Sequence, residues 1–173
     1  MKKIHNIAFV DGQNLHLGTQ SEGWIIDFKK FYIHLKDKYK IKFANFYIGH
    51  YVSENDFLYE KIKNAGFNLI FRDHNENQKG TKKGNVDVDI VFDVMEKIIK
   101  KKEFDKIILV SGDGDYFRIV NFLIKNGLFG KILFPNTKRS SLYKKITRHF
   151  GTYLNEKGIK EKIGINKKGR GLA

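Results

Sequence analysis

The chain has 173 residues, of which 41% are hydrophobic and 14% aromatic, and this length and composition suit one folded domain with a sizeable core. It contains no cysteine, which excludes a disulfide framework and a zinc site built on thiolates. Lys and Arg number 33 against 19 Asp and Glu, and the formal net charge of +14 favours a polyanionic partner, nucleic acid above all, over a merely lysine-rich surface.

Strand and helix patterns alternate along the chain. The first predicted strand covers residues 4–10, and Asp11 with Gly12 forms a turn after it. The first half continues with a helix at 27–39, a strand at 41–48, a helix at 54–65, a short strand at 67–71 and a polar loop at 72–84. The second half has helices at 87–102, 116–125 and 140–149, which alternate with strands at 106–110, 128–134 and 152–154.

This alternation predicts an α/β fold with a mainly parallel central sheet, in one domain that spans residues 1–154. Residues 155–173 are rich in Lys and Gly and are expected to form a loose, basic tail. No apolar run approaches the roughly 18 residues that cross a membrane. No small-residue cleavage site follows the first apolar run, so this run is interpreted as a strand and not as a signal peptide. We therefore expect a cytoplasmic protein without a membrane partner.

Two sets of aspartates follow predicted strands, at the edge of a parallel sheet where ligands usually bind. Asp11 comes after the first strand, and Asp113 with Asp115 comes after the strand at 106–110. Each set also has an ordinary structural explanation. Asp11 could form only a turn with Gly12, and Asp113 could cap the helix that follows it.

A third acidic position opens the helix at 87–102. At about 100° per residue, Asp87 falls on the apolar face of that helix, whereas Asp89 and Asp93 point away from it. Asp87 could merely favour the first turn of its helix, as acidic residues do. Convergence of all three sets on one edge instead predicts a divalent cation, and oxygen ligands alone favour Mg²⁺ or Mn²⁺.

Three motifs occur in a characteristic order: VDGQNL at residues 10–15, KGNVDVDIVFD at 83–93 and SGDGDY at 111–116. Together they resemble the NYN domain family of PIN-like nucleases, in the branch of the LabA-type bacterial proteins. The resemblance implies a PIN-like three-layer α/β/α fold. It also implies metal-dependent cleavage of RNA, single-stranded RNA above all, with one or two Mg²⁺ or Mn²⁺ ions and pairing into a homodimer as an option.

The resemblance also implies which residues carry the chemistry. It gives catalytic or metal-binding roles to Asp11, Asn14, Asp87, Asp113 and Asp115, with Asp93 as a secondary metal position. Because Asn85 lengthens the second motif by one residue, the choice between Asp87 and Asp89 stays open, and the helical face favours Asp87. Hydrolysis in line would leave a 5′-phosphate and a 3′-hydroxyl.

Basic and aromatic residues near the same edge are candidates for contacts with RNA. Basic side chains would hold phosphates without reading sequence, and the candidates are Lys79, Lys82, Lys83, Arg118, Lys138, Arg139, Lys144, Lys145 and Arg148. Aromatic side chains would stack on bases, with packing in the core as the alternative, and the candidates are Trp24, Tyr47, His50, Tyr51 and Tyr116. A binding module that keeps the metal site and cleaves little is an alternative to the nuclease.

Overall fold

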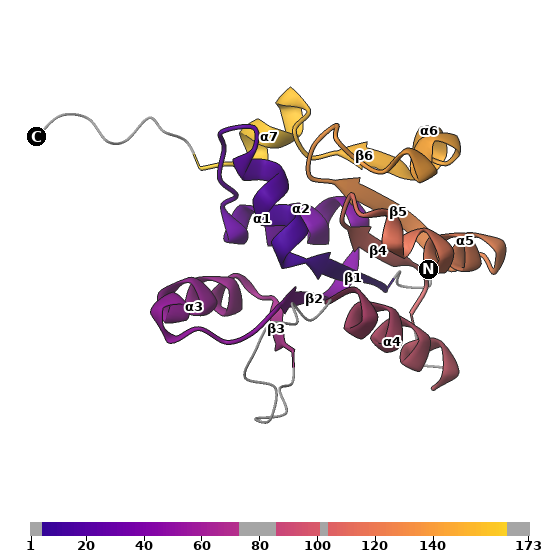
Figure 1. Ribbon diagram of the computed structural model, residues 1–173, viewed down its shortest axis with the longest axis horizontal. Helices are drawn as coiled ribbons and strands as arrows, with labels where there is room; N and C mark the ends of the chain where they lie inside the picture. Colours follow the sequence, from indigo (N-terminus) through magenta and orange to yellow (C-terminus); the bar gives the residue numbers. More distant parts are fainter. Residues whose placement is uncertain (1–4, 73–85, 101–103, 166–173) are drawn as a thin grey trace, which may run out of the picture.

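A six-stranded sheet forms the centre of the protein, with the strand order β3-β2-β1-β4-β5-β6 (Figure 1). The computed structural model describes residues 5–72, 86–100 and 104–165. Every pair of neighbouring strands is parallel, which confirms the expected α/β class. The strands are β1 (Asn6–Asp11), β2 (Ile41–Ile48), β3 (Asn68–Phe71), β4 (Ile107–Val110), β5 (Phe129–Phe134) and β6 (Gly151–Tyr153).

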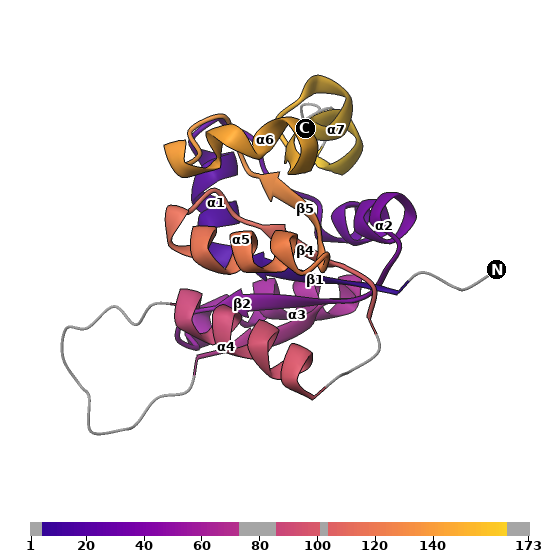
Figure 2. The same cartoon turned by 90° about the vertical axis from the view of Figure 1, so that its right-hand side faces the viewer.

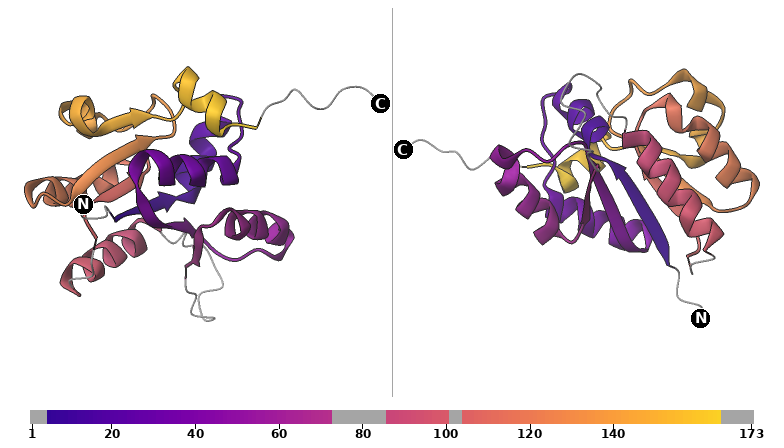
Figure 3. Two further views of the ribbon diagram at one scale, coloured as in Figure 1. Left: turned by 180° about the vertical axis from the view of Figure 1, so that it is seen from behind. Right: turned by 60° about the horizontal axis from the view of Figure 1, so that its bottom comes forward.

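Helices cover both faces of the sheet, as Figure 2 and the right-hand view of Figure 3 show. One layer contains α1 (Gly12–Gln20), α2 (Phe28–Tyr39), α3 (Asp56–Ala65) and α7 (Lys157–Ile163). The other contains α4 (Val86–Ile99), α5 (Phe117–Lys125) and α6 (Thr147–Phe150). Three short 3₁₀ helices lie in the connections: η1 (Ser53–Asn55), η2 (Gly114–Tyr116) and η3 (Ser141–Lys145). Within the described residues, no helix is both long enough and apolar enough to cross a membrane.

The central strand β1 separates two hydrophobic cores. Its side chains alternate between the faces of the sheet, so that Ala8 and Val10 pack toward α1, α2 and α3, while Ile7 and Phe9 pack toward α4 and α5. The same alternation directs the next odd-numbered side chain, Asp11, to the α4 and α5 face. The strand therefore delivers a carboxylate to one particular side of the sheet edge.

The structure differs from the sequence prediction just after β1. A helix, α1, stands where a turn was expected at Asp11 and Gly12. Asp11 caps this helix, since its side chain accepts a hydrogen bond from the backbone of Asn14, and Leu15 and Thr19 are buried one turn apart on its inner face. The helix expected at 140–149 is also divided in two, into η3 and α6.

The expected loose tail is wrong for residues 155–165, because this stretch packs against the body of the protein. The helix α7 buries Ile159 and Ile163, and the Ile163 carbonyl accepts a hydrogen bond of 2.8 Å from the backbone of Asp27. Asn155 donates two hydrogen bonds, of 2.8 and 3.0 Å, to the carboxylate of Glu22. Residues 166–173 lie outside the described part of the chain.

We predict that α7 contributes to the stability of the domain. Ile163→Ala should lower the free energy of unfolding by about 2–5 kcal/mol, because the Ile163 side chain is fully buried against α2. Ile165→Ala is the matched control, since Ile165 is 54% exposed and its loss should cost less than about 0.5 kcal/mol. Urea unfolding of both variants measures the difference, and equal losses would contradict a packed α7.

Candidate metal centre

The carboxyl ends of β1 and β4 form the point where the order of the sheet reverses. From β1 the chain builds outward through β2 to β3, and it then returns to β4, on the other side of β1, and continues to β6. Loops that leave two such neighbouring strands diverge, and the crevice between them is where open parallel sheets bind ligands. Asp11 is the last residue of β1, and Ser111 follows the end of β4.

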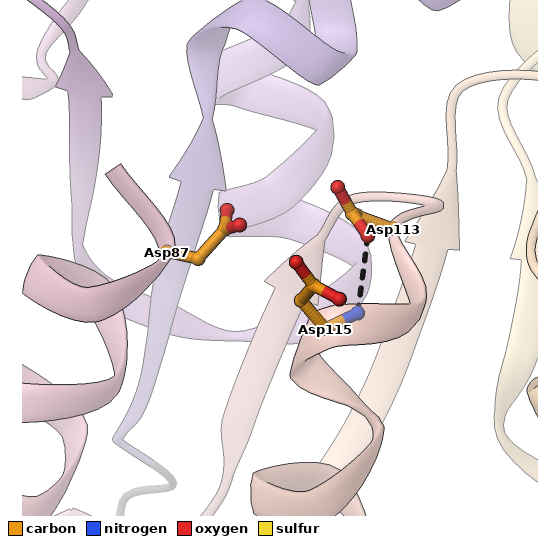
Figure 4. Close-up of side chains that lie close together, drawn as sticks. All are labelled: Asp87, Asp113 and Asp115. Atoms are coloured by element: carbon orange, nitrogen blue, oxygen red, sulfur yellow. Dashed lines mark hydrogen bonds between the residues drawn. The ribbon is translucent and has the colours of Figure 1, made fainter. Parts of the chain in front are cut away.

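Three carboxylates meet at this crevice. Asp87, Asp113 and Asp115 each offer one oxygen atom, and these atoms all lie within 4.8 Å of one another. Figure 4 shows Asp87 on the first turn of α4 facing Asp113 and Asp115 on the segment that follows β4. Asp87 is buried, Asp113 is half-buried and Asp115 is exposed, so the group opens toward solvent on one side.

Local hydrogen bonds fix the segment that carries Asp113 and Asp115. The backbone N–H of Asp113 donates to Ser111 Oγ at 3.1 Å, and the N–H of Asp115 donates to Asp113 Oδ1 at 3.0 Å. The hydroxyl of the buried Tyr143, 30 residues further on, donates to the carbonyl oxygen of Asp113. Asp113 thus caps η2, which is the ordinary structural role that the sequence allowed for it. Its Oδ2 is not used by this cap.

Asp11 lies behind these three carboxylates and is only 5% exposed. Its Oδ1 accepts a hydrogen bond of 2.9 Å from the backbone of Asn14, and its Oδ2 accepts one of 3.1 Å from the hydroxyl of Tyr116. Burial raises the pKa of Asp11, and the negative charges of Asp87 and Asp113 raise it further, against the lowering effect of its two hydrogen bonds. The raised pKa means that the ionised form of Asp11 is disfavoured beside these two carboxylates.

Asn14 holds the two halves of the crevice together. Its side-chain oxygen accepts a hydrogen bond of 2.8 Å from the backbone N–H of Gly112, which links α1 to the segment after β4. The sequence singled out Asn14 as a catalytic candidate. The contact in the structure is one that positions Asp113 relative to Asp11.

Tyr116 is a buried hydrogen-bond donor rather than a platform for a base. Its side chain is fully buried, and burial followed by the charges of Asp11 and Asp87 raises its pKa far above the ordinary value. A hydroxyl in this environment keeps its proton, so it can donate to Asp11 at all ordinary pH values. Sequence inspection could not find this contact, which joins residues 105 positions apart.

The motif resemblance gives Asp93 a secondary metal position, but in the structure its carboxylate accepts a hydrogen bond from a tyrosine. The hydroxyl of Tyr47, on β2, donates a hydrogen bond of 2.6 Å to Asp93 Oδ2, and Asn45 donates to that hydroxyl at 3.3 Å. Asp93 is half-buried and faces β2, so the helical-face argument that turned it away from the core is wrong. Within the described residues, the three-carboxylate group includes neither Asp93 nor Asp89.

The basic candidates divide into accessible and packed side chains. Lys138, Lys144 and Lys145 are exposed on the segment after β5, and Arg118 is exposed on α5. The guanidinium of Arg139 instead lies over the rings of Phe134 and Tyr153, at 5.5 and 5.9 Å from their centroids. Arg148 is on α6, which leads into the amino end of β6, away from the carboxyl edge. Lys79, Lys82 and Lys83 lie outside the described residues.

The donor atoms of the crevice fit a hard divalent cation. Carboxylate oxygens are the ligands that Mg²⁺ and Mn²⁺ prefer, and these ions usually keep several water molecules in their coordination shell. A site formed by three carboxylates and open on the Asp115 side leaves room for such water molecules or for a phosphate oxygen. Asp87, Asp113 and Asp115 could therefore hold one ion, with Asp11 behind it.

Comparisons with known proteins concern the family and the fold of this chain. The family model described as the NYN domain matches residues 6–152. The low amplitude and bright protein LabA of Synechococcus elongatus is 25% identical, in a match that covers 66% of this chain and 65% of that protein, less than two thirds of its length. A crystal structure of a protein of unknown function, VPA0982 from Vibrio parahaemolyticus, has the same fold, with a TM-score of 0.73, 19% identity and coverage of 95% of this chain and 99% of that one.

We predict that Mn²⁺ stabilises the protein through Asp87. A ligand at one hundred times its Kd adds about 2.7 kcal/mol, which raises the melting temperature of a domain of this size by about 5–10 °C. Asp87→Asn should abolish this shift because it removes one of the three converging carboxylates. Asp89→Asn, on the same helix, is the matched control and should keep it. If Mn²⁺ still raises the melting temperature of Asp87→Asn but not that of Asp89→Asn, then Asp89 and not Asp87 binds the ion.

We also predict that Asp11 makes the metal-free protein less stable as the pH rises. The unfolded chain releases this proton near pH 3.8, whereas the folded protein, with its raised pKa, keeps the proton to higher pH. The folded state binds more protons over this interval, so the free energy of unfolding falls as the pH increases through it. Asp11→Asn cannot ionise but keeps an oxygen to cap α1.

Urea unfolding in EDTA between pH 4 and pH 7 tests this expectation. As the pH increases, the free energy of unfolding of Asp11→Asn should rise relative to that of the wild type. The difference should grow by about 1.4 kcal/mol for each unit by which the pKa of Asp11 is raised. Parallel pH profiles for the two proteins would contradict a raised pKa at Asp11.

Proposed function

The chain belongs to the NYN domain family, and from this membership and the carboxylate group at the β1–β4 crevice we propose that it is a metal-dependent endoribonuclease. The substrate would be RNA, with single strands preferred, and the cofactor Mg²⁺ or Mn²⁺. The observation that carries the proposal is the convergence of Asp87, Asp113 and Asp115 in a chain whose net charge is +14. A divalent cation at this position would offset the mutual repulsion of the three carboxylates.

Each acidic residue would have a separate task in this reaction. Asp87, Asp113 and Asp115 would hold the ion, which when bound lowers the pKa of a water molecule and neutralises charge that develops on the phosphate. Asp11, fixed by Tyr116, would add negative potential behind the ion and help to retain it. Asn14 would keep Asp113 at the correct distance from Asp11 through its hydrogen bond with Gly112.

The basic segment after β5 would bind the RNA backbone. Lys138, Lys144 and Lys145 are exposed and follow a strand whose carboxyl end lies beside that of β4. Lysines in such a position attract phosphates of any sequence, and their contribution weakens as salt is added. Arg118 on α5 would extend the same surface.

An RNA-binding module that cleaves little is the alternative function. One observation favours it: both oxygens of Asp11 already accept hydrogen bonds from the protein, so its part in holding an ion is limited to its remaining lone pairs. Incubation of single-stranded RNA with the purified protein, with and without Mn²⁺, separates the two functions because only the nuclease shortens the RNA.

We predict that Asp113→Asn reduces the rate of RNA cleavage at least about 100-fold, because it removes one converging charge from the ion site. The variant should fold, since an asparagine can still cap η2. Asp37→Asn is the matched control. Asp37 is exposed near the end of α2, just before β2 begins, and thus lies at the amino edge of the sheet.

Cleavage of a labelled single-stranded RNA in Mn²⁺ measures both rates, and circular dichroism verifies folding. If purified Asp113→Asn cleaves RNA at the wild-type rate, the activity does not depend on this crevice. Binding without cleavage by the wild-type protein would favour the alternative function.

A further inference from the structure

A cavity of about 530 Å³ opens beside the metal centre, on the other side of the sheet edge. Its walls come from α1, the connection from α1 to α2, the end of β2 with the loop after it, and α3. The aromatic part of the lining consists of Trp24, Phe28, Phe46 and Tyr59. We call this space the base cavity.

The lining of the base cavity is neutral in a chain that is otherwise rich in charge. Charged residues make up 30% of the sequence, yet none of the described residues around this cavity is Lys, Arg, Asp or Glu. Apolar and aromatic side chains form its depth, and exposed polar side chains stand at its rim: Gln13, His16 and Asn55. Such a lining suits a flat, uncharged group with hydrogen-bonding edges.

The base cavity and the metal centre share the end of β1. Gly12 lines the cavity and directly follows Asp11. A side chain at position 12 would not fit, because its Cβ would lie 2.6 Å from the carbonyl oxygen of Tyr47 and 2.5 Å from the Phe46 ring. The backbone therefore passes close to β2 here, and the cavity reaches the residue next to Asp11.

The strand order places three different surfaces in a row along one edge of the sheet. Exposed lysines follow β5, the carboxylates follow β4 and β1, and the base cavity lies beyond β1 at the end of β2. A polymer that has phosphates and neutral aromatic groups in alternation matches this row. An anion such as free phosphate would match the lysines but not the neutral cavity.

We propose that the base cavity takes a nucleobase of single-stranded RNA, from a nucleotide near the scissile phosphate. The identity of the polymer rests on the proposed function. The base packs against the exposed apolar part of the lining, which consists of Ile25, Val52 and Leu58. The rim residues Gln13, His16 and Asn55 meet its polar edge. The cavity thereby sets which nucleotide is held beside the metal centre, and so contributes to the choice of cleavage site.

Trp24 gives a direct readout, because it is the single tryptophan of the chain and it lines the cavity. The wild-type protein in EDTA is titrated with a single-stranded RNA oligonucleotide and with an abasic ribose-phosphate oligomer of equal length, while Trp24 fluorescence is recorded. We expect a saturable change in emission with RNA, and no change with the abasic oligomer at the concentrations that saturate the response to RNA.

Two variants close or alter the cavity. Gly49→Phe should obstruct it, because Gly49 lines the cavity and a Cβ at this position meets nothing within 4 Å. Leu58→Glu places a charge in the neutral lining at a residue that is 39% exposed. Both should abolish the emission change that RNA produces. Gly158→Phe is the matched control, since its Cβ also meets nothing within 4 Å and it lies on α7, outside the cavity.

The results separate this proposal from the proposed function. Asp113→Asn should keep the full Trp24 response, because the cavity does not depend on the ion. A response of equal size to the abasic oligomer, or an unchanged response in Gly49→Phe, would overturn the base cavity even if the protein cleaves RNA. A Trp24 response to an apolar peptide but not to RNA would also overturn it, in favour of a protein partner. A specific response to RNA without cleavage would support the cavity and refute the nuclease.

Discussion

The buried carboxylate of Asp11 is the constraint on which the centre of this molecule depends. It ends the central strand, caps α1 and accepts a hydrogen bond from Tyr116, so three elements are fixed around one side chain. Asn14, the residue that donates to Asp11 through its backbone, uses its side chain to hold Gly112. Asp113 and Asp115 are therefore placed through a short chain of contacts that begins at Asp11. Asp11 can cap α1 and also lie beside the other carboxylates, because the position that caps the helix is at the crevice.

The crevice is costly to the fold, and the surrounding tyrosines limit that cost. Burial and the charges of Asp87 and Asp113 together raise the pKa of Asp11, which means that the ionised form is disfavoured in the absence of a cation. Tyr116 and Tyr47 are buried in the same core and donate to Asp11 and Asp93, while Tyr143 donates to the backbone of Asp113. Burial and nearby carboxylates raise the pKa of all three phenols, so they remain donors. The hydroxyls of these tyrosines therefore help to keep the acidic side chains in fixed positions.

Much of this architecture could be predicted from the sequence, and the failures have physical causes. The alternation of residues 41–48 predicts β2, and the apolar face of residues 87–98 predicts α4. Because ligands bind at the carboxyl edge of a parallel sheet, the sequence also predicts that Asp11, Asp87 and Asp113 lie near one another. The helix α1 was missed because two glycines and several polar residues weaken its periodicity, although Asp11 is a good cap. Lysines and glycines likewise obscured the spacing of Ile159 and Ile163 in α7. The hydrogen bonds of Tyr47 and Tyr116, and the base cavity, join residues far apart in the chain and leave no local pattern.

The order of surfaces along the sheet edge would favour a single strand as the substrate of the proposed nuclease. Neighbouring strands are about 4.8 Å apart, so the lysines after β5 and the cavity beyond β1 are separated by only a few such steps. A short stretch of an extended strand can therefore meet the lysines, the carboxylates and the cavity at the same time. A duplex keeps its bases stacked and paired, and it can offer none of them to a pocket beyond the scissile phosphate. In the proposed function, the opposite charges of this protein would act on different parts of one polymer: the basic surface would gather the backbone, the acidic crevice would hold the ion, and the neutral cavity would select a base.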